Sequence, residues 1–362
     1  MALDILNLEE STITTGLEGK FLAWYGVNNV GKSYVASELF PGQTLWLATE
    51  NGTAAIPGVY TVNIETWRDF RNVVSQLTTK NKTKREKLEE KYKCVVIDVM
   101  DRLPALCTDY VVNDYNERNA DKPGFVPIKD ITGIPWGAGK GIRDKEKDFW
   151  LNKLSLSKYC KIGIFHQEIK KTKIDGEEIE CVVPRNTSDK FGATFTDLPD
   201  FFFWVENMGA NEDGSPRLSV GHCVQNQNYF ARSRFFSCDF NVAPFTAENV
   251  KKAVKEACEK EAARRNVSTV TYDQEFAKRE REKTEKKKTS QELIDEIAPI
   301  YKALHEAGFG SYMGSIVGDF LGYDENDKPN KISKATENQT EALQGIYDKF
   351  LDMAEEKGID WE

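Results

Sequence analysis

The stretch that most constrains this chain runs from Gly26 to Ser33 and reads Gly-Val-Asn-Asn-Val-Gly-Lys-Ser, a complete G-x-x-x-x-G-K-[ST] phosphate-binding loop. An apolar segment of strand length, 20–25, precedes it, and residues 34–39 can continue as a helix before Pro41. A strand, a glycine-bounded loop and a helix start surround phosphate with backbone N–H groups and the positive end of a helix dipole. The sequence therefore predicts that the chain binds a nucleoside triphosphate.

Each position of this loop is a candidate for nucleotide binding: Gly26, Val27, Asn28, Asn29, Val30, Gly31, Lys32 and Ser33. Lys32 is expected to reach the β- and γ-phosphates, and the Ser33 hydroxyl is expected to bind Mg²⁺. The competing interpretation is a glycine turn with a solvated lysine, which the flanking strand and helix patterns disfavour. ATP and Mg²⁺ are thus the expected ligands.

Composition narrows the class of protein. At 362 residues the chain is long enough for two domains. No apolar run approaches the roughly 20 residues that span a bilayer, and residues 1–10 lack the pattern of a secretory signal. Seven scattered cysteines without a C-x-x-C pair argue against disulfides and structural zinc, and predict a reducing, cytoplasmic location. A net charge of −9 means that any nucleic-acid contact would come from local basic loops.

Polar residues follow the predicted strands at the points where these strands end. After the phosphate loop, the apolar run 44–49 ends at Glu50, the run 94–97 ends at Asp98, and the run 160–165 ends at His166. Continuous apolar runs of this length are typical of buried parallel strands. Because parallel α/β sheets bind ligands at the carboxyl edge of their strands, we expect these groups to converge on the nucleotide.

These residues have distinct expected roles. Asp98 would hold Mg²⁺ through its water shell, and Glu50 would polarise the attacking water. His166, or its neighbour Gln167, would sense the γ-phosphate. The ordinary alternatives are an aspartate that solvates a turn, a surface acid in a Glu-Asn-Gly turn, and a strand-end histidine with local partners only.

Positive charge gathers after His166, on a predicted hairpin with arms 169–174 and 178–183 and a turn at 175–176. Phosphate neutralisation would suit this charge, while the acids on the returning arm leave a salt-bridged hairpin as the alternative. The candidate DNA contacts are Lys170, Lys171, Lys173, Arg185 and Lys190. Arg232 and Arg234 are candidates for trans-acting cations at a neighbouring subunit's nucleotide, or are ordinary surface arginines.

The remaining segments are less regular. Prolines and glycines within 101–145 are expected to prevent long regular elements. Thr246 is expected to cap a helix, the charged tract up to 288 is a solvated helix or a mobile linker, and a capping box starts at Thr289. We predict an ATPase core over 1–245, a charged helical linker over 246–288 and a helical module over 289–362.

Taken together, these segments resemble the RecA-like P-loop ATPases. The resemblance covers about residues 10–240 and rests on the phosphate loop, 45–52, 95–98, 164–168 and the Trp136-Gly137 stretch ahead of the helix near Trp150. The chain looks most like compact AAA-type ATP-binding proteins of bacteriophages, some of which are single-strand annealing or recombination proteins. Two features depart from the pattern: the Thr-Glu-Asn-Gly ending of the second motif, and the charged tract with its helical tail.

The resemblance implies a fold, a reaction and partners. The expected fold is α/β, a RecA-like P-loop NTPase core with a mainly parallel central sheet, followed by a small helical C-terminal region. The implied reaction is Mg²⁺-dependent hydrolysis of ATP to ADP and phosphate. The implied partners are single-stranded DNA and further copies of the chain in a ring or filament, with no membrane.

Three functions remain open on sequence alone. The first is a DNA-dependent ATPase of phage recombination or replication. The second is an ATP-switched assembly or helicase-loading factor, whose C-terminal helices would bind a replication or single-strand-binding protein. The third is a small-molecule kinase, disfavoured because no arginine-rich lid is evident and the basic hairpin suits a polyanion better than a metabolite.

Overall fold

The computed structural model describes residues 12–50, 56–79, 81–174, 177–187, 190–215, 217–235, 241–285 and 289–359. The chain divides into two compact units, of which one spans Thr12–Tyr272 and the other has its described part over 273–359. The first unit contains the phosphate loop. It extends past the predicted core end at 245 because the helix that follows packs on the sheet.

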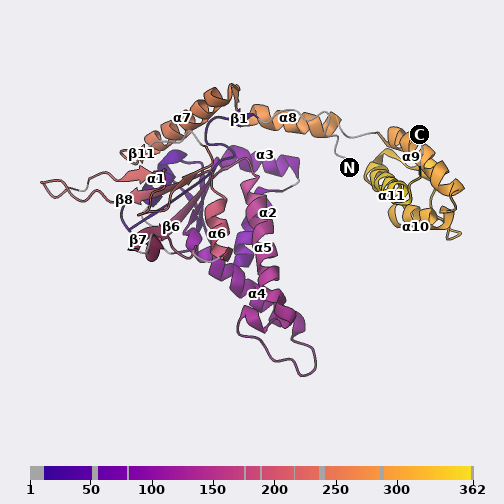
Figure 1. Ribbon diagram of the computed structural model, residues 1–362, viewed down its shortest axis with the longest axis horizontal. Helices are drawn as coiled ribbons and strands as arrows, with labels where there is room; N and C mark the ends of the chain where they lie inside the picture. Colours follow the sequence, from indigo (N-terminus) through magenta and orange to yellow (C-terminus); the bar gives the residue numbers. More distant parts are fainter. Residues whose placement is uncertain are drawn as a thin grey trace. The chain divides into compact units, whose positions relative to one another are not determined.

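A sheet of ten described strands forms the centre of the first unit (Figure 1). Six strands are parallel, in the spatial order β8 (Phe201–Glu206), β2 (Phe21–Gly26), β6 (Cys160–Ile174), β5 (Cys94–Asp98), β3 (Thr44–Ala48) and β4 (Tyr60–Asn63). Four strands pair antiparallel at the periphery: β7 (Glu177–Pro184), β9 (Val220–His222), β10 (Arg232–Ser233) and β11 (Asn241–Val242). The prediction of a mainly parallel sheet with C-terminal helices is confirmed.

Helices cover both faces of this sheet. Consecutive residues of a central strand are apolar and point to opposite faces, so both faces present apolar side chains that need a cover. Leu22 and Trp24 of β2 belong to one buried core, whereas Phe21, Ala23 and Tyr25 belong to the other. The first core is closed by α1 (Lys32–Leu39) and α7 (Ala247–Arg265). The second is closed by α2 (Trp67–Leu77), α4 (Leu103–Asn119), α5 (Ala138–Ser155) and α6 (Lys190–Asp197), while α3 (Lys82–Lys91) buries no residue.

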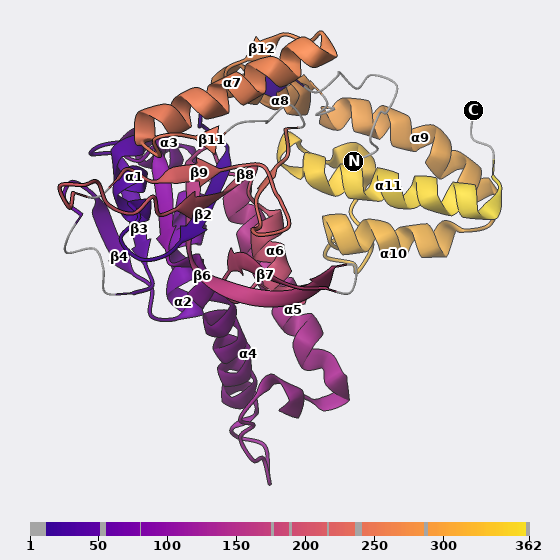
Figure 2. The same cartoon turned by 60° about the vertical axis from the view of Figure 1, so that its left-hand side comes forward.

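The segment 101–145 is more regular than the sequence predicted, and that prediction was wrong. The short turn η2 (Met100–Arg102) leads directly into α4, whose Pro104 lies in the first turn, where a proline costs no hydrogen bond. Farther along, α5 begins inside the glycine-rich stretch at Ala138. Gly139 is required there by packing, because a Cβ would overlap the carbonyl oxygen of Ile131. Figures 1 and 2 show α4 and α5 side by side as a helical hairpin, one end of which packs on the sheet while the other projects beyond it.

The predicted strand at 160–165 and the predicted hairpin arm at 169–174 form one continuous strand, β6. Its first part pairs with β2 and β5 inside the sheet, and its second part pairs with β7. His166 therefore lies within a strand rather than at its end. The predicted turn at 175–176 lies outside the described residues.

The charged tract after 245 contains two helices. Thr246 caps α7, as predicted, but Val250, Val254 and Cys258 of this helix are buried in the core, so this part of the predicted linker belongs to the first unit. The helix α8 (Tyr272–Glu285) follows, and a small pair of strands, β1 (Ile13–Thr14) and β12 (Thr269–Val270), lies apart from the main sheet.

Besides most of α8, the second unit contains three described α-helices that surround a core of their own: α9 (Ser290–Glu306), α10 (Gly310–Leu321) and α11 (Thr340–Lys357). The capping box at Thr289 is present, and α9 continues through Pro299 instead of stopping there. Across the described ranges, none of the helices has the length and apolarity needed to cross a bilayer.

Candidate nucleotide site

The phosphate loop joins the carboxyl end of β2 to the first turn of α1. Gly26 cannot carry a side chain, because a Cβ would lie 2.5 Å from the carbonyl oxygen of Val205 on the neighbouring strand β8. Gly31 has a left-handed backbone with φ of 86° at the N-cap of α1, which favours glycine. The indole N–H of Trp24 donates to the carbonyl of Lys32 over 3.1 Å. The two glycines of the motif are therefore required by the backbone.

Lys32 is almost buried, and its ammonium donates to the carbonyls of Gly26, at 2.8 Å, and Val27, at 2.7 Å. Burial lowers the pKa of Lys32 to about 8, against the opposing effect of the nearby carboxylates of Asp98 and Asp101. The ammonium is thus held inside the loop by neutral oxygens. Phosphate oxygens can replace those carbonyls and would stabilise the charged form.

The hydroxyl of Ser33 donates to Oδ2 of Asp98 over 2.9 Å, although the two residues are 65 positions apart. Asp98 ends β5 at the same sheet edge as the loop. Burial raises the pKa of Asp98, and the Ser33 hydrogen bond and the charge of Lys32 oppose this shift. Hydroxyl and carboxylate oxygens are the ligands that Mg²⁺ prefers, so this pair fits the ion that the sequence predicts there.

A row of charged side chains lies beside Ser33 and Asp98, the two residues that could bind Mg²⁺ and that we call the metal pair. His166 places Nε2 3.8 Å from Oε2 of Glu50 and Nδ1 3.1 Å from Oδ2 of Asp101. Asp101 is buried, and its Oδ1 has no hydrogen-bond partner among the described residues. The hydrogen bond to Asp101 raises the pKa of His166; burial opposes the shift, and the charges of Asp101 and Glu50 add to it. The imidazole therefore lies between two carboxylates, which favour its protonated form.

Both arms of the β6–β7 hairpin are attached to this row of charged side chains. One arm leaves the sheet through His166 itself. At the end of the returning arm, the backbone N–H of Arg185 donates to the carbonyl of His166 over 2.9 Å, and the side-chain amide of Asn186 donates to the carbonyl of Asp101 over 3.0 Å. These contacts connect His166 and Asp101 to both arms of the hairpin.

Asp101 and Asn186 were missed by sequence reasoning. Asp101 lies in the single turn η2, which has no periodicity, and Asn186 lies in the loop after β7. A second acid three residues after Asp98 was the one available signal for Asp101. Nothing local distinguishes Asn186, because its partner is 85 residues away.

The structure brings the predicted strand-end groups together. Lys32, Ser33, Glu50, Asp98 and His166 line one pocket of about 700 Å³. Their roles in binding and hydrolysis stay predictions. Gln167, the alternative sensor, is half-buried and pairs with Pro184 of β7.

A second pocket of about 610 Å³ adjoins the first on the other side of the loop and shares with it Asn29, Gly31, Tyr34 and Glu38. It reaches toward Arg217 and Lys251. The phosphate loop thus lies between two hollows, one with the metal pair and one without it.

The candidate DNA contacts on the hairpin are partly engaged with acids. Lys171 pairs with Glu178 across the two strands at 2.8 Å, and Lys170 pairs with Glu168 at 3.7 Å. Arg185 is exposed, and its backbone N–H donates to the carbonyl of His166, which lines the nucleotide pocket. The side chains of Lys173 and Lys190 lie outside what the structure describes. A salt-bridged hairpin is therefore present, and its contact with DNA stays a prediction.

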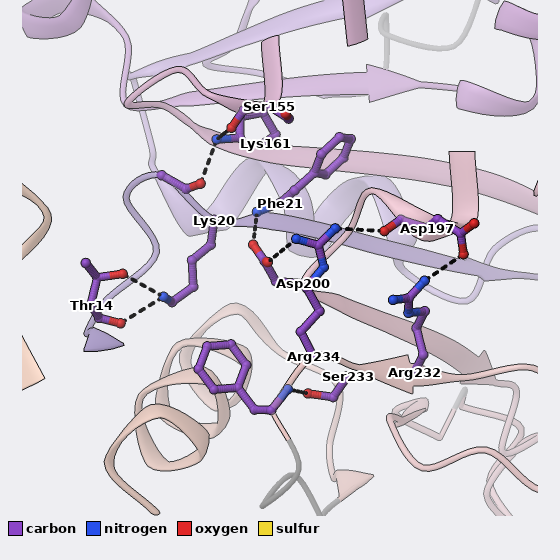
Figure 3. Close-up of polar contacts among 12 residues, drawn as sticks. Thr14, Lys20, Phe21, Ser155, Lys161, Asp197, Asp200, Arg232, Ser233 and Arg234 are labelled. Carbon is purple, nitrogen blue, oxygen red and sulfur yellow. Dashed lines mark hydrogen bonds and ion pairs between the residues drawn. The ribbon is translucent and has the colours of Figure 1, made fainter. Parts of the chain in front are cut away.

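The two candidate trans-acting arginines, which Figure 3 shows with their carboxylate partners, lie near the start of β8. The phosphate loop follows the carboxyl end of the parallel neighbour β2 and is therefore at the opposite edge of the sheet. Arg232 pairs with Asp197 at 2.8 Å. Arg234 pairs with Asp200 at 3.6 Å, and Asp200 also accepts a hydrogen bond from the backbone of Phe21. Neither arginine approaches the nucleotide pocket of its own chain, and contact with a neighbouring subunit's nucleotide stays a prediction.

Two comparisons with known proteins indicate what the chain is similar to. Residues 18–235 match a family model described as an AAA domain, a span that contains the loop, Glu50, Asp98, Asp101 and His166. The chain is also 30% identical over 360 residues to the SPbeta prophage-derived uncharacterized protein YorG of Bacillus subtilis (strain 168). That alignment covers 98% of this chain and 100% of the relative, so the likeness includes the C-terminal unit.

Proposed function

The chain belongs to the AAA-domain family of P-loop ATPases. On this basis we propose that it is an ATPase of phage recombination or replication whose activity depends on single-stranded DNA. The family and the prophage relative support ATP binding and hydrolysis. The observation that carries the proposal is the contact of Ser33 with Asp98 beside the buried ammonium of Lys32. The dependence of hydrolysis on DNA is the part of the proposal that goes beyond ATP binding and hydrolysis.

Each residue of the pocket would have its own role in phosphoryl transfer. Lys32 would neutralise the β- and γ-phosphates, and Ser33 and Asp98 would hold Mg²⁺. The ion, when bound, supplies positive charge to the phosphate oxygens. Glu50 is partly exposed and would accept a hydrogen bond from the attacking water, because its carboxylate lies in the same pocket as the metal pair.

His166 supplies the link to DNA. A γ-phosphate beside its imidazolium would compete with Glu50 for the ring Nε2–H, while Asp101 keeps hold of Nδ1. Because β6 continues unbroken from His166 into the hairpin that carries Lys170 and Lys171, hydrolysis would alter the hairpin's hold on DNA. The reverse coupling would let bound DNA raise the affinity for the γ-phosphate of ATP, since coupling free energies are reciprocal for binding. Faster hydrolysis in the presence of DNA is a separate part of the proposal.

The second pocket offers a place for the nucleoside. It lies on the side of the loop away from Asp98, and Tyr34 at its border is largely exposed, so an aromatic face is available for stacking on a base. Arg217 and Lys251 add positive charge. The triphosphate would then cross the loop from this hollow to the metal pair.

The decisive experiment measures ATP turnover by the full chain with and without single-stranded DNA. We expect stimulation by DNA in the wild type and no ATP binding in Lys32→Ala. An ATPase rate that is unchanged by single-stranded DNA would contradict the DNA half of the proposal and leave ATP binding intact. Electron microscopy with an ATP analogue, with and without DNA, would distinguish a filament, a ring and a single copy.

One observation favours the second candidate function, an ATP-switched assembly or helicase-loading factor. The C-terminal unit has its own core and a pocket of about 540 Å³ whose lining includes Ile297, Tyr301, Val317 and Lys331. A replication or single-strand-binding protein with an apolar segment would fit such a hollow. Slow turnover, no DNA retention and partner binding that requires residues 289–362 would favour this alternative.

A further inference from the structure

Arg185 follows the returning arm of the β6–β7 hairpin and lies directly across from His166. The antiparallel register of this hairpin pairs Gln167 with Pro184, so the next pair along it is His166 with Arg185. The hydrogen bond from the backbone N–H of Arg185 to the carbonyl of His166, 2.9 Å long, continues that ladder. Opposite residues of an antiparallel pair present their side chains on one face, with Cβ atoms about 5 Å apart. The side chain of Arg185 therefore leaves the backbone on the face that carries the imidazole of His166.

The backbone at Arg185 is anchored on both sides. Before it, Pro184 is buried, and its carbonyl accepts a hydrogen bond of 2.7 Å from the hydroxyl of Thr187. After it, Asn186 has a left-handed backbone with φ of 59°, which asparagine tolerates better than most residues. The side-chain amide of Asn186 also donates to the carbonyl of Asp101 over 3.0 Å. These contacts hold the backbone of Arg185 beside the row of charged side chains.

The side chain of Arg185, in contrast, is available to a ligand. It is exposed, and among the described residues its guanidinium has no ion-pair or hydrogen-bond partner. The hydrogen bond to Asp101 has the largest effect on the pKa of His166 and raises it, whereas the nearby charge of Arg185 lowers it. The guanidinium thus lies close enough to the imidazolium to repel it. An anion that contacts both groups would relieve this repulsion.

The nucleotide pocket has little positive charge for a triphosphate. Three carboxylates lie in it or directly beside it: Glu50, Asp98 and Asp101. Two cations line it, Lys32 and His166. ATP with one Mg²⁺ adds further negative charge, and during phosphoryl transfer this charge is spread over the oxygens of the γ-phosphate. A further cation on the face of His166 would offset the excess.

We propose that Arg185 binds the γ-phosphate of the nucleotide held by its own chain and stabilises the charge of that phosphate during hydrolysis. A guanidinium presents two parallel N–H groups, which fit two oxygens of one phosphate. The γ-phosphate would then contact the ends of both hairpin arms, one through His166 and the other through Arg185. This inference rests on the proposed ATPase function. It assigns Arg185 to the nucleotide in place of the DNA contact expected from the sequence.

Arg102, a second exposed arginine near this row, has different contacts. Its guanidinium donates to the carbonyl of Thr49 over 2.6 Å. That hydrogen bond ties the turn after β5 to the residue that follows β3, which gives Arg102 a structural role. Arg185 has no such bond among the described residues, and its side chain can turn toward the pocket while the backbone stays in place.

The first measurement is the affinity of the full chain for ADP and for a non-hydrolysable ATP analogue, by calorimetric titration with Mg²⁺ present. Arg185→Ala should weaken binding of the analogue by about tenfold or more, in keeping with the loss of hydrogen bonds between charged groups, and should leave the affinity for ADP unchanged. Arg185→Lys should recover part of the loss, because an ammonium supplies charge without the paired N–H groups. Arg118→Ala is the matched control, since Arg118 is an exposed arginine in the last turn of α4 that pairs with Asp114.

The second measurement is ATP turnover at increasing concentrations of an oligodeoxythymidylate. In Arg185→Ala the rate at saturating DNA should fall by about 100-fold or more, as expected for an arginine that stabilises phosphoryl transfer. The DNA concentration that gives half of the maximal rate should not change. This split separates a contact with the nucleotide from a contact with DNA.

An equimolar mixture of Arg185→Ala and Lys32→Ala chains separates action within a chain from action on a neighbour. The first variant keeps the phosphate-loop lysine, and the second keeps Arg185. The mixture would regain turnover if Arg185 of one chain served the nucleotide of another. We expect no recovery, because the inference places both groups at one nucleotide of one chain.

Each contrary outcome identifies what is wrong. A wild-type maximal rate that Arg185→Ala reaches only at higher DNA concentration would overturn the inference and assign Arg185 to DNA. Recovery of turnover in the mixture would overturn it in favour of a neighbouring chain's nucleotide. If the wild type binds the analogue without hydrolysing ATP, the proposed function fails, and the ratio of analogue affinity to ADP affinity still decides the γ-phosphate contact. An unchanged ratio in Arg185→Ala would contradict that contact.

Discussion

The buried carboxylate of Asp101 lies 3.1 Å from Nδ1 of His166, on the side of the ring away from Glu50. This contact fixes the ring orientation and leaves Nε2 directed toward the nucleotide pocket. It also raises the pKa of His166. Asp101 is thus a positioning residue, because it acts on the nucleotide through the histidine and does not line the pocket itself.

Asp101→Asn should lower the pKa of His166 and reduce turnover more than it reduces ATP affinity. The amide keeps the shape of the side chain and removes the negative charge that favours the imidazolium. NMR titration is practical because the chain has three histidines. Asp130→Asn is the matched control, since Asp130 is exposed and bonds locally to Thr132. A His166 titration that does not move in Asp101→Asn would contradict the assignment.

Stability should depend on pH through the same pair. Because folding raises the pKa of His166 above its ordinary value of 6.5, the pair contributes its full stabilisation at pH values below 6.5 and loses it as pH rises through the raised value. Chemical denaturation of the wild type across that range should show this loss. His166→Gln should remove that component of the pH dependence, and a curve of unchanged shape would refute the linkage.

Glu50→Gln should bind ATP with near wild-type affinity and hydrolyse it about 100-fold more slowly or worse, the usual effect of removing a general base. The glutamine can still contact water but cannot accept its proton. Single-turnover hydrolysis and calorimetric titration separate the two effects. Glu38→Gln is the control, because Glu38 also lines the pocket but lies on α1. Equal losses in both variants would argue against a specific role for Glu50.

Two glycines in α5 should respond oppositely to alanine. Gly139→Ala should destabilise the chain by about 1–3 kcal/mol, the typical cost of overpacking, because its Cβ would overlap the main chain of Ile131. Gly141→Ala should stabilise it by about 0.5–1 kcal/mol, as expected for alanine in an open helical position. Apart from the chain neighbours and the backbone of its own helix, no atom lies within 4 Å of the position of a Cβ at Gly141. Thermal or urea unfolding measures both, and effects of the same sign would be inconsistent with this packing.

Lys32→Ala should abolish ATP binding in a calorimetric titration while the chain remains folded. The ammonium of Lys32 contacts carbonyls of its own loop. Its loss therefore removes the positive charge that would bind phosphate without breaking a core contact. Lys153→Ala, which changes a lysine far along α5, should leave ATP affinity unchanged. Persistent turnover in Lys32→Ala would show that the nucleotide binds elsewhere.

Much of the nucleotide site could be predicted from the sequence because its signals are local. The motif from Gly26 to Ser33 specifies a loop between a strand and a helix, and the apolar run before Asp98 specifies a buried parallel strand. Since parallel strands end at one edge, the order of these segments was enough to expect that Glu50, Asp98 and His166 would meet. The caps at Thr246 and Thr289 were likewise readable from a few neighbouring residues.

Other features depended on contacts between residues far apart in the chain. Whether a basic residue faces the nucleotide depends on strand pairing, and the pairing of β10 with the start of β8 placed Arg232 and Arg234 at the opposite edge. The glycines near 139 predicted an irregular segment. In the structure Gly139 lies within a helix, where its close packing against Ile131 requires a glycine.

The sequence by itself determined the phosphate loop and the sheet edge at which the chemistry lies, because short motifs and apolar periodicity act over a few residues. The tertiary structure alone decided that Asp101 would hold His166 and that the hairpin would be attached to both. Those contacts join residues 65 and 85 positions apart, and their geometry exists only once the strands between them have paired.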